Sequence, residues 1–352
     1  MKKRLLIINQ AQFGYHMCSV QYCIFLRDEF EITYLCWDYK RKRIDETGVE
    51  IILVPRKGNI IIRNIKFIYF VITYLLKEKF DFVYIDYFRG SSLISLLNIN
   101  KQSLHLDFRT GSISKSKSTR FINDFMRRME SKFFLSQSVI SAGLRKKLQI
   151  RQDAYILPLG ANPLILKREC THFLYLLYIG VFNHRRMEDT IDGFKLFLTK
   201  NPKADIHYTL VGDGEQNERE ILQKRIDQLG LRKYIDLTGY VPYNELLKFY
   251  ELANVGVSYI PITSYFEFQP PTKTFEYLMA GMPVIATRTY ENMQIVNQLN
   301  GVLIKDTPES FAKGIEHIYN LYSNFDENAI RKSVESYEWS KIVQNMKKAI
   351  LS

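Results

Sequence analysis

Short apolar runs and longer segments of helical period alternate along the chain. In the first half, seven runs rich in β-branched and aromatic residues predict strands. They are Leu5–Ile8, Ile32–Cys36, Ile51–Val54, Phe82–Ile85, Leu104–Phe108, Val139–Ser141 and Tyr155–Leu157. Segments such as Ile65–Lys79 and Thr119–Leu135 have the apolar spacing of helices and lie between these strands.

The second half shows the same alternation more clearly. Met187, Ile191, Phe194 and Leu198 follow the first apolar run at steps of 4, 3 and 4, which places them on one face of a helix. The predicted strands are Leu174–Ile179, Ile206–Val211, Ile235–Leu237, Val255–Tyr259, Val284–Ala286 and Val302–Ile304.

This alternation predicts an α/β protein in which helices cover both faces of parallel sheets. A chain of 352 residues suggests two domains. We expect two doubly wound, Rossmann-like domains, 1–160 and 161–335, which face each other across a cleft, and a C-terminal helix in 336–352 that packs back on the first domain. The join lies in the turn-rich segment Pro158–His172.

The charge is distributed unevenly. The chain has 49 Lys and Arg against 37 Asp and Glu, a formal net charge of +12. Residues 1–165 hold 27 of the basic and 14 of the acidic residues, so the first half carries the whole excess. A basic domain attracts an anionic partner such as nucleic acid, anionic lipid or a phosphorylated substrate, and a solvated surface without a partner is the alternative.

Cysteine usage and hydropathy indicate a cytoplasmic protein. Cys18, Cys23, Cys36 and Cys170 form no CxxC pair and no zinc spacing, so we expect reduced, partly buried thiols. The apolar run near the N-terminus is too short for a signal peptide. In the most apolar stretch, Ile60–Leu76, basic residues leave a run shorter than the ~20 residues of a membrane span. A buried helix and a membrane-facing helix both fit this stretch.

The segment 266–287, FEFQPPTKTFEYLMAGMPVIAT, carries the clearest chemistry. Its two prolines start a predicted helix, Thr272–Ala280, which Gly281 ends. The free N–H groups at Thr272–Thr274 form an anion site, to which Lys273 adds a full charge. Glu276 shares a helix face with Lys273, so a phosphate at the tip and a ribose one turn deeper match a nucleotide. An exposed helical ion pair is the alternative.

These residues resemble the nucleotide-sugar signature of retaining GT-B glycosyltransferases, especially family 4, the glycosyl transferases group 1. Further stretches agree in order: ILPLGAN at 156–162, YIGVFNHRRMEDTIDGF at 178–194, LVGDGE at 210–215 and LTGYVPYNELLKFYELANVGVSYIP at 237–261. The resemblance covers about 156–322 and is diffuse over 1–155, where such enzymes vary with the acceptor.

The resemblance implies a nucleoside diphosphate sugar as donor, bound by the second domain. Arg185 and Arg186 would hold its diphosphate, because Arg presents a planar fork to phosphate. Lys273 and the tip at Thr272 would add a second phosphate contact, and Glu276 would hold the ribose. The turn residues Tyr240 and Val241 would lie against the base.

Two positions depart from the family pattern. Val181 stands where the family often has Arg, and Phe268 stands where the first glutamate of Glu-x7-Glu is expected, with Glu276 as the second. We expect Glu267, Gln269 or a backbone amide to contact the donor sugar instead. The predicted catalytic residues are Arg186, Lys273, Glu267 and Asp107.

The first domain offers four candidate residues. Gly14, in the loop after the first strand, would let the backbone approach the donor phosphates, and His16 could face the cleft. Asp107 and Arg109 alternate at a strand end and share a face, where they could hold the acceptor or its phosphate. A structural ion pair is the alternative for these two residues.

The basic excess itself points to the acceptor. Phe121, Phe125 and Met129 recur at helical spacing within a segment that contains Lys115, Lys117, Arg120, Arg127, Arg128 and Lys132. Such a basic amphipathic helix can lie on an anionic bilayer and suggests a lipid-linked, pyrophosphorylated acceptor. A core-packed helix with a solvated basic face is the alternative.

We therefore predict a retaining, metal-independent hexosyltransferase without a cofactor. It would transfer a hexose from a nucleoside diphosphate sugar to a glycan acceptor in cell-surface polysaccharide biosynthesis, in the cytoplasm or at the inner membrane face. A sugar-nucleotide epimerase of the same fold, a nucleic-acid-binding protein and a catalytically inactive family member are the alternatives. We expect no nucleic-acid partner, because no such motif accompanies the basic residues.

Overall fold

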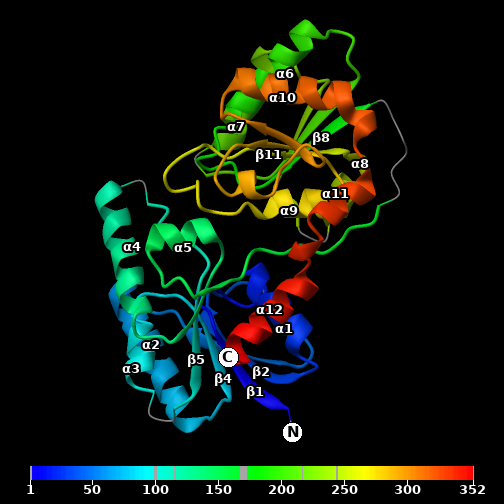
Figure 1. The fold of residues 1–352 in the computed structure, drawn as a ribbon. Helices are drawn as coiled ribbons and strands as arrows, with labels where there is room; N and C mark the ends of the chain where they lie inside the picture. Colours follow the sequence, from blue (N-terminus) through cyan, green and yellow to red (C-terminus); the bar gives the residue numbers. More distant parts are fainter. Residues whose placement is uncertain are drawn as a thin grey trace. The chain divides into compact units, whose positions relative to one another are not determined.

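The computed structural model describes residues 2–98, 101–114, 116–166, 173–215, 217–242 and 245–351. The chain divides into two compact units, which we call unit 1 and unit 2. Unit 1 consists of 1–160 together with 339–352, and unit 2 consists of 161–338 (Figure 1). The sequence placed the corresponding boundaries at 160 and 335. Lys115 and Cys170, together with the end of the predicted join, lie outside the described residues.

Unit 1 contains a seven-stranded, wholly parallel sheet of order β3-β2-β1-β4-β5-β6-β7. The strands are β1 (Lys3–Ile8), β2 (Phe30–Asp38), β3 (Val49–Pro55), β4 (Phe82–Asp86), β5 (Ser103–Phe108), β6 (Ser136–Val139) and β7 (Tyr155–Ile156). The helices are α1 (Met17–Leu26), α2 (Ile60–Lys77), α3 (Ser92–Leu96), α4 (Lys117–Ser131), α5 (Ala142–Leu148) and α12 (Trp339–Leu351). The central strand β1 is fully buried at Leu5–Ile8, as its continuous apolar run requires.

The last helix of the chain, α12, packs against the rest of unit 1. Trp339, Ile342 and Met346 are buried, and the Ser136 hydroxyl donates to the carbonyl of Ala349 at 3.0 Å. Gly160 makes this packing possible, since a Cβ there would lie 2.7 Å from the Trp339 ring. The core of unit 1 therefore requires residues from both ends of the chain.

Unit 2 contains a six-stranded parallel sheet of order β10-β9-β8-β11-β12-β13. Its strands are β8 (Leu174–Ile179), β9 (Ile206–Val211), β10 (Ile235–Gly239), β11 (Val255–Ser258), β12 (Val284–Thr287) and β13 (Gly301–Ile304). Its α-helices are α6 (Glu188–Lys200), α7 (Glu218–Gln228), α8 (Leu247–Leu252), α9 (Thr272–Met279), α10 (Pro308–Leu321) and α11 (Glu327–Ser333). Within its described residues it also contains the short 3₁₀ helices η2 (Asn292–Gln294), η3 (Tyr322–Asn324) and η4 (Glu335–Tyr337).

Two parallel sheets with intervening helices confirm the predicted fold class of two Rossmann-like domains. The predicted and observed elements differ at their ends, because side-chain caps set where helices begin. The predicted strand Val139–Ser141 is wrong, because β6 ends at Val139 and the Ser141 hydroxyl accepts from the amide of Leu144 to cap α5. Helix α2 begins at Ile60, where the apolar stretch Ile60–Leu76 begins and five residues before the helical segment Ile65–Lys79, because the Asn59 side chain caps its first turn.

Exposure resolves the two alternatives for the apolar stretch at α2. Phe67 and Val71 are buried, whereas Ile61 and Tyr69 on the opposite face are about two-thirds exposed. The helix is therefore buried on one face only. Within the described residues no helix combines the length and apolarity that crossing a bilayer demands. Cys18, Cys23 and Cys36 are free and buried, in agreement with the predicted reduced state.

Candidate functional site

The tip of α9 is held at the carboxyl end of the unit 2 sheet. Pro271 has an extended backbone conformation and precedes the first helical residue, Thr272. Thr274 is buried, and its hydroxyl lies 2.7 Å from that of Ser258 and 3.0 Å from the side-chain oxygen of Asn292. The free N–H groups of this tip are therefore fixed beside the end of β11, where ligands bind in parallel sheets.

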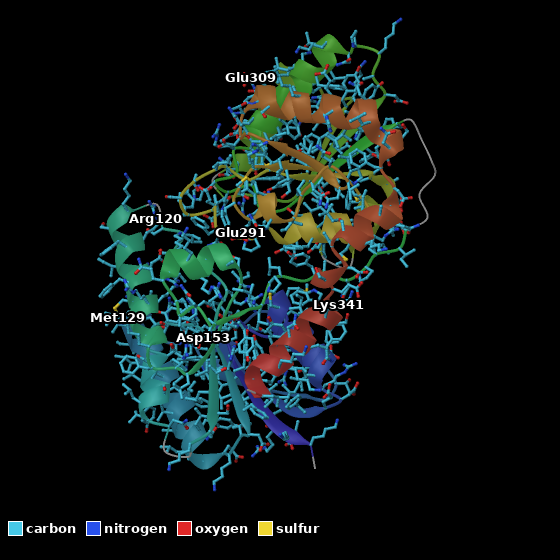
Figure 2. All side chains as sticks on the ribbon, in the orientation of Figure 1. Arg120, Met129, Asp153, Glu291, Glu309 and Lys341 are labelled. Atoms are coloured by element: carbon cyan, nitrogen blue, oxygen red, sulfur yellow. The ribbon has the colours of Figure 1, made fainter. Side chains whose placement is uncertain are left out.

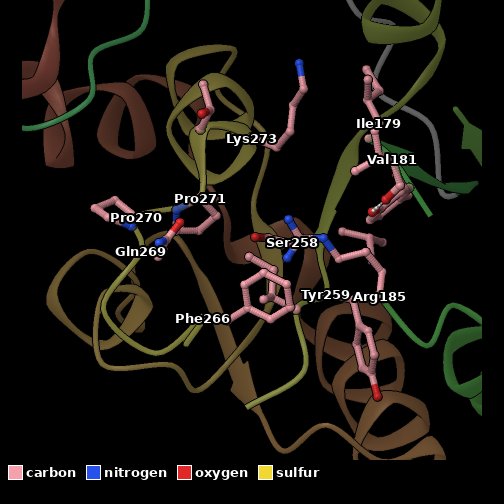
Figure 3. Close-up of a pocket in the computed structure, with 15 residues that line it drawn as sticks. Ile179, Val181, Arg185, Ser258, Tyr259, Phe266, Gln269, Pro270, Pro271 and Lys273 are labelled. Carbon is pink, nitrogen blue, oxygen red and sulfur yellow. Dashed lines mark hydrogen bonds between the residues drawn. The ribbon is translucent and has the colours of Figure 1, made fainter. Parts of the chain in front are cut away.

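A cavity of about 370 Å³ lies beside this tip (Figure 3). The ends of β8 and β11, which are neighbours in the sheet, form its floor. The loop before α9 and the first residues of α9 form its wall. The lining residues that bear on its chemistry are Gly180, Val181, Arg185, Ser258, Gln269, Thr272 and Lys273.

Arg185 brings a cation to this cavity. Its guanidinium carbon lies 4.4 Å from the centre of the Phe266 ring (Figure 3). Its Nη1 is buried and has no hydrogen-bond partner among the described residues. Stacking on an aromatic ring orients the guanidinium and leaves its in-plane donors available to an anion. The diphosphate contact of Arg185 stays a prediction, and this geometry makes the side chain available for it.

Arg186 is directed elsewhere. Its backbone is left-handed, with φ of 53°, and its side chain pairs with Asp189 at 2.6 Å and with Asp306 at 3.2 Å. It lines a separate hollow together with Met187 and Glu188. The structure thus brings only one of the two predicted arginines to the cavity beside α9. Nothing in the sequence pattern distinguishes the two, because the left-handed backbone of Arg186 itself sets the direction of its side chain.

Lys273 and Glu276 form an ion pair that joins two cavities. Lys273 lines the cavity beside the α9 tip, and Glu276 lines a second cavity of about 280 Å³. The Tyr250 hydroxyl donates to Oε2 of Glu276 at 2.8 Å, the oxygen that also accepts from Lys273. The ion pair named as an alternative therefore exists, and both of its members nevertheless face ligand-sized cavities.

The second cavity includes residues that the sequence analysis did not single out. These are Asn162, Pro163, Leu164, Leu246, Leu247 and Tyr250. Tyr240 and Val241, predicted to contact a base, line neither cavity, and Tyr240 is about three-quarters exposed. The sequence did contain a sign of this cavity wall: Leu246 and Tyr250 are four residues apart, so they lie on the same face of a helix.

In the loop before α9, the structure distinguishes between Glu267 and Gln269, the two side chains expected to contact the donor sugar in place of the missing glutamate. Gln269 lines the cavity beside the α9 tip, whereas Glu267 lines neither cavity. The Glu267 amide donates to the Thr263 carbonyl at 2.9 Å, which fixes the turn. Phe268 packs against the ring of Tyr290 at 5.2 Å. The geometry therefore favours Gln269, and not the predicted catalytic residue Glu267, as the contact to a ligand.

In unit 1, Asp107 and Arg109 form the structural ion pair that was the alternative. Asp107 has no exposed surface and accepts from the Ser138 hydroxyl, and its Oδ2 lies 3.5 Å from Nε of Arg109. Arg109 donates to the Leu157 carbonyl at 2.7 Å. The predicted catalytic role of Asp107 finds no support, because this carboxylate offers no exposed atom to an acceptor.

Gly14 and His16 have local structural roles. Gly14 has φ of 89°, and a Cβ on it would lie 2.5 Å from the Ile44 side chain. His16 lies 2.7 Å from the Ser19 hydroxyl through Nδ1 and 3.7 Å from Asp86 through Nε2. Burial, and then the positive charge of Arg109, lower the pKa of His16 to about 4, so this ring is neutral at pH 7.

Asp86 is a buried carboxyl group that the sequence analysis missed. It accepts from the side-chain amide of Asn9 at 2.7 Å. Burial first, and then the negative charge of Asp107, raise its pKa to about 8. Within the described residues no three His, Cys, Asp or Glu side chains gather in a way that could hold a metal ion.

Comparisons with known proteins find similarity in the second unit. Residues 174–320 match the family model of the glycosyl transferases group 1. An uncharacterized glycosyltransferase of Methanocaldococcus jannaschii is 28% identical over 177 residues, which cover 48% of this chain and 42% of that relative. The aligned part thus spans less than half the length of the relative.

Solved structures extend the likeness to the fold of both units. The lipopolysaccharide outer core galactosyltransferase WaaB has a TM-score of 0.74 at 14% identity, over 99% of both chains. Anabaena HepE in complex with UDP and glucose has a TM-score of 0.74 at 12% identity, over 99% of both chains. A TarM variant of S. aureus with bound UDP has a TM-score of 0.73 at 10% identity, over both whole chains. At these identities the likeness shows the fold alone. Residues 174–320 thus match the glycosyl transferases group 1, and the chain has the GT-B fold.

Proposed function

We propose that this protein is a glycosyltransferase that uses a nucleoside diphosphate sugar. The observation that carries the proposal is the cavity at the α9 tip, where free helical N–H groups, Lys273 and Arg185 converge. This arrangement suits a diphosphate, because helix N-termini and arginine forks both bind phosphate oxygens. The HepE structures contain UDP, glucose and UDP-glucose, which makes a UDP-hexose the first donor to test.

The two cavities suggest how such a donor would lie. The diphosphate and sugar would occupy the cavity with Arg185 and Lys273, and the ribose would approach Glu276 in the second cavity. In this pose Lys273 contacts phosphate while Tyr250 still donates to Glu276, so the carboxylate keeps its orientation toward the ribose hydroxyls.

The chemistry follows from the leaving group. The bond between the anomeric carbon and the diphosphate oxygen breaks, and negative charge develops on the diphosphate. Arg185, Lys273 and the α9 tip would stabilise that charge without a metal or cofactor, which is electrostatic catalysis by fixed donors. Retention at the anomeric carbon is the outcome that the family resemblance implies.

The proposed acceptor is a lipid-linked glycan of a cell-surface polysaccharide, reached from the cytoplasmic side of the membrane. Its support is the outer face of α4, where Phe121 is 73% exposed and Phe125 is 47% exposed. Met129 projects outward from the same helix (Figure 2). The core-packed alternative for this helix is therefore wrong. Exposed aromatics flanked by Lys117 and Arg128 suit the interface of an anionic bilayer.

A thermal-shift screen tests the proposed donor. We expect UDP or a UDP-hexose to raise the melting temperature of the wild type, because a ligand that binds only the folded state stabilises it. Turnover with the stabilising sugar nucleotide then decides the reaction. Transfer to an added glycan would support the proposal, and interconversion of the sugar nucleotide without any acceptor would replace it with the epimerase.

A further inference from the structure

The first unit carries stacked arginines and aromatic rings where β2 and β3 end. The rings of Trp37 and Tyr39 have centroids 6.1 Å apart. The Arg56 guanidinium carbon lies 4.4 Å from the centre of the Tyr39 ring and 5.4 Å from that of Trp37. Arg63 lies 5.6 Å from the Trp37 ring, and Arg41 lies 5.4 Å from the Tyr39 ring. We call these five residues the arginine–aromatic platform.

Within the part of the chain that the structure describes, no ion pair engages Arg41, Arg56 or Arg63. Nε of Arg56, Nε of Arg63 and the indole nitrogen of Trp37 are buried, and no described residue accepts a hydrogen bond from them. Buried donors are normally satisfied, so this group of unused donors requires an explanation.

Neighbouring charges show that this arrangement is specific to the platform. Arg43, two residues from Arg41, pairs with Asp45 at 2.7 Å. The nearby carboxylate of Asp38 accepts from the backbone amide of Lys40 at 2.7 Å. Acidic groups are thus present at this edge of the sheet, but they do not neutralise the stacked arginines.

The platform is held in place before any ligand arrives. The buried Gln12 side chain accepts from the amides of Tyr39 at 3.0 Å and Arg41 at 3.3 Å, and it donates to the Arg41 carbonyl at 3.1 Å. The Tyr15 hydroxyl donates to the Lys42 carbonyl at 3.1 Å. A loop fixed in this way loses little conformational entropy when it binds a ligand.

Its position in the fold is one where ligands collect. Strands β2 and β3 are parallel neighbours, and they end at Asp38 and Pro55 respectively. Arg63 comes from the first turn of α2, which begins at Ile60. The platform therefore lies at the carboxyl edge of the unit 1 sheet. Like charges repel when brought together, and a bound anion would remove that repulsion.

We propose that the arginine–aromatic platform binds the pyrophosphate group of a ligand. Arginine forks suit the paired oxygens of such a group, and three cations complement its charge. The identification of this group with the pyrophosphate of a lipid-linked acceptor rests on the proposed glycosyltransferase function, whereas the anion site itself does not.

Isothermal titration with inorganic pyrophosphate and with farnesyl pyrophosphate tests the site. The full chain carries K273M throughout, so that the α9 tip competes less for the probe. We expect R56M/R63M to bind both probes at least about tenfold more weakly than the parent, because two charged forks are lost. R56K keeps the charge but loses the fork, so its affinity for both probes should lie between that of R56M/R63M and that of the parent. R43M is the matched control, since its arginine has a carboxylate partner, and it should bind within about twofold of the parent.

Each result decides the proposal. If R56M/R63M is folded by circular dichroism and binds pyrophosphate as R43M does, the platform is not the site. Tighter binding of farnesyl pyrophosphate than of inorganic pyrophosphate would identify a prenyl pyrophosphate as the source, and equal binding would identify the free anion. Arginine-dependent binding without any UDP binding by the wild type would sink the proposed function and leave the site standing. UDP binding by the wild type, together with pyrophosphate binding that does not depend on the platform arginines, would rule out the anion site and leave the proposed function standing.

Discussion

The carboxyl edges of the two sheets both carry cations, but the charges are held in different ways. In unit 2, Lys273 pairs with Glu276, and Arg186 pairs with Asp189 and Asp306. In unit 1, the arginines of the platform stack on aromatic rings instead. An ion pair leaves no net charge, whereas a ring orients a guanidinium and leaves its charge intact. The cavity of unit 2 contains both arrangements, since Arg185 stacks on Phe266 whereas Lys273 pairs with Glu276.

The largest effect should come from K273M, because it removes the charge at the α9 tip and leaves Glu276 unpaired. We expect UDP binding and sugar transfer to fall by about a hundredfold, as for the loss of one fixed donor to a developing anion. Isothermal titration with UDP and turnover measurements would show this. K248M is the matched control, since Lys248 also pairs with a glutamate three residues away, Glu245. An equal loss in both variants would contradict the assignment.

The two neighbouring arginines test whether ring stacking or ion pairing marks a ligand contact. R185M should weaken UDP binding by about tenfold, because a stacked guanidinium with a buried, unpartnered Nη1 is lost. R186M should change UDP binding by less than about twofold, since this side chain pairs with two carboxylates outside the cavity. The reverse order would show that Arg186 turns into the cavity when the donor binds.

The outer face of α4 tests how much of the unit 1 charge serves a membrane. We expect F121S/F125S to reduce co-sedimentation with vesicles of anionic lipid by about fivefold, because two exposed rings no longer enter the interface. High salt should weaken the binding of the wild type further. The matched control is L252S, which changes an exposed apolar residue of α8 in unit 2. If the wild type does not bind these vesicles, or if salt does not weaken its binding, the basic face of α4 is a solvated surface and does not bind an anionic membrane.

The smallest effect concerns stability and the buried carboxyl of Asp86. Its folded pKa of about 8 lies above the ordinary value for Asp, so the folded state binds the extra proton and its stability falls as the pH rises toward 8. His16, with its pKa lowered to about 4, has the opposite effect between pH 4 and 6.5, so the decline should be clearest from pH 6.5 to 8.

D86N should flatten that decline, which cannot exceed about 1.4 kcal/mol per pH unit for one group. Urea unfolding at several pH values measures it. D153N is the control, because Asp153 is exposed and Arg151 lowers its pKa, so it stays ionised over this range. An unchanged slope in D86N would show that another group carries the proton.

Much of the fold was predictable from local pattern. Continuous apolar runs predicted β8 and β9 to the residue, because strands buried on both faces have little choice of composition. Pro271 and Gly281 predicted both ends of α9, since proline and glycine act on the backbone directly. The end of β6 was missed, and the helical segment Ile65–Lys79 was placed too late, because the N-cap residues Ser141 and Asn59 set the starts of α5 and α2 against the apolar pattern.

The candidate site was predictable only in part, for a related reason. The chain's own order of residues determined two parallel sheets, a helix tip with Lys273 and Glu276 beside it, and a basic first half. Only the tertiary structure decided which cations face a cavity. The left-handed backbone at Arg186 turns it away from Arg185, and the platform joins Trp37 to Arg56 and Arg63 from the next strand end and helix. Composition and spacing determine local secondary structure, because they act on the backbone of neighbouring residues. The partner of a long charged side chain depends instead on residues that only folding brings together.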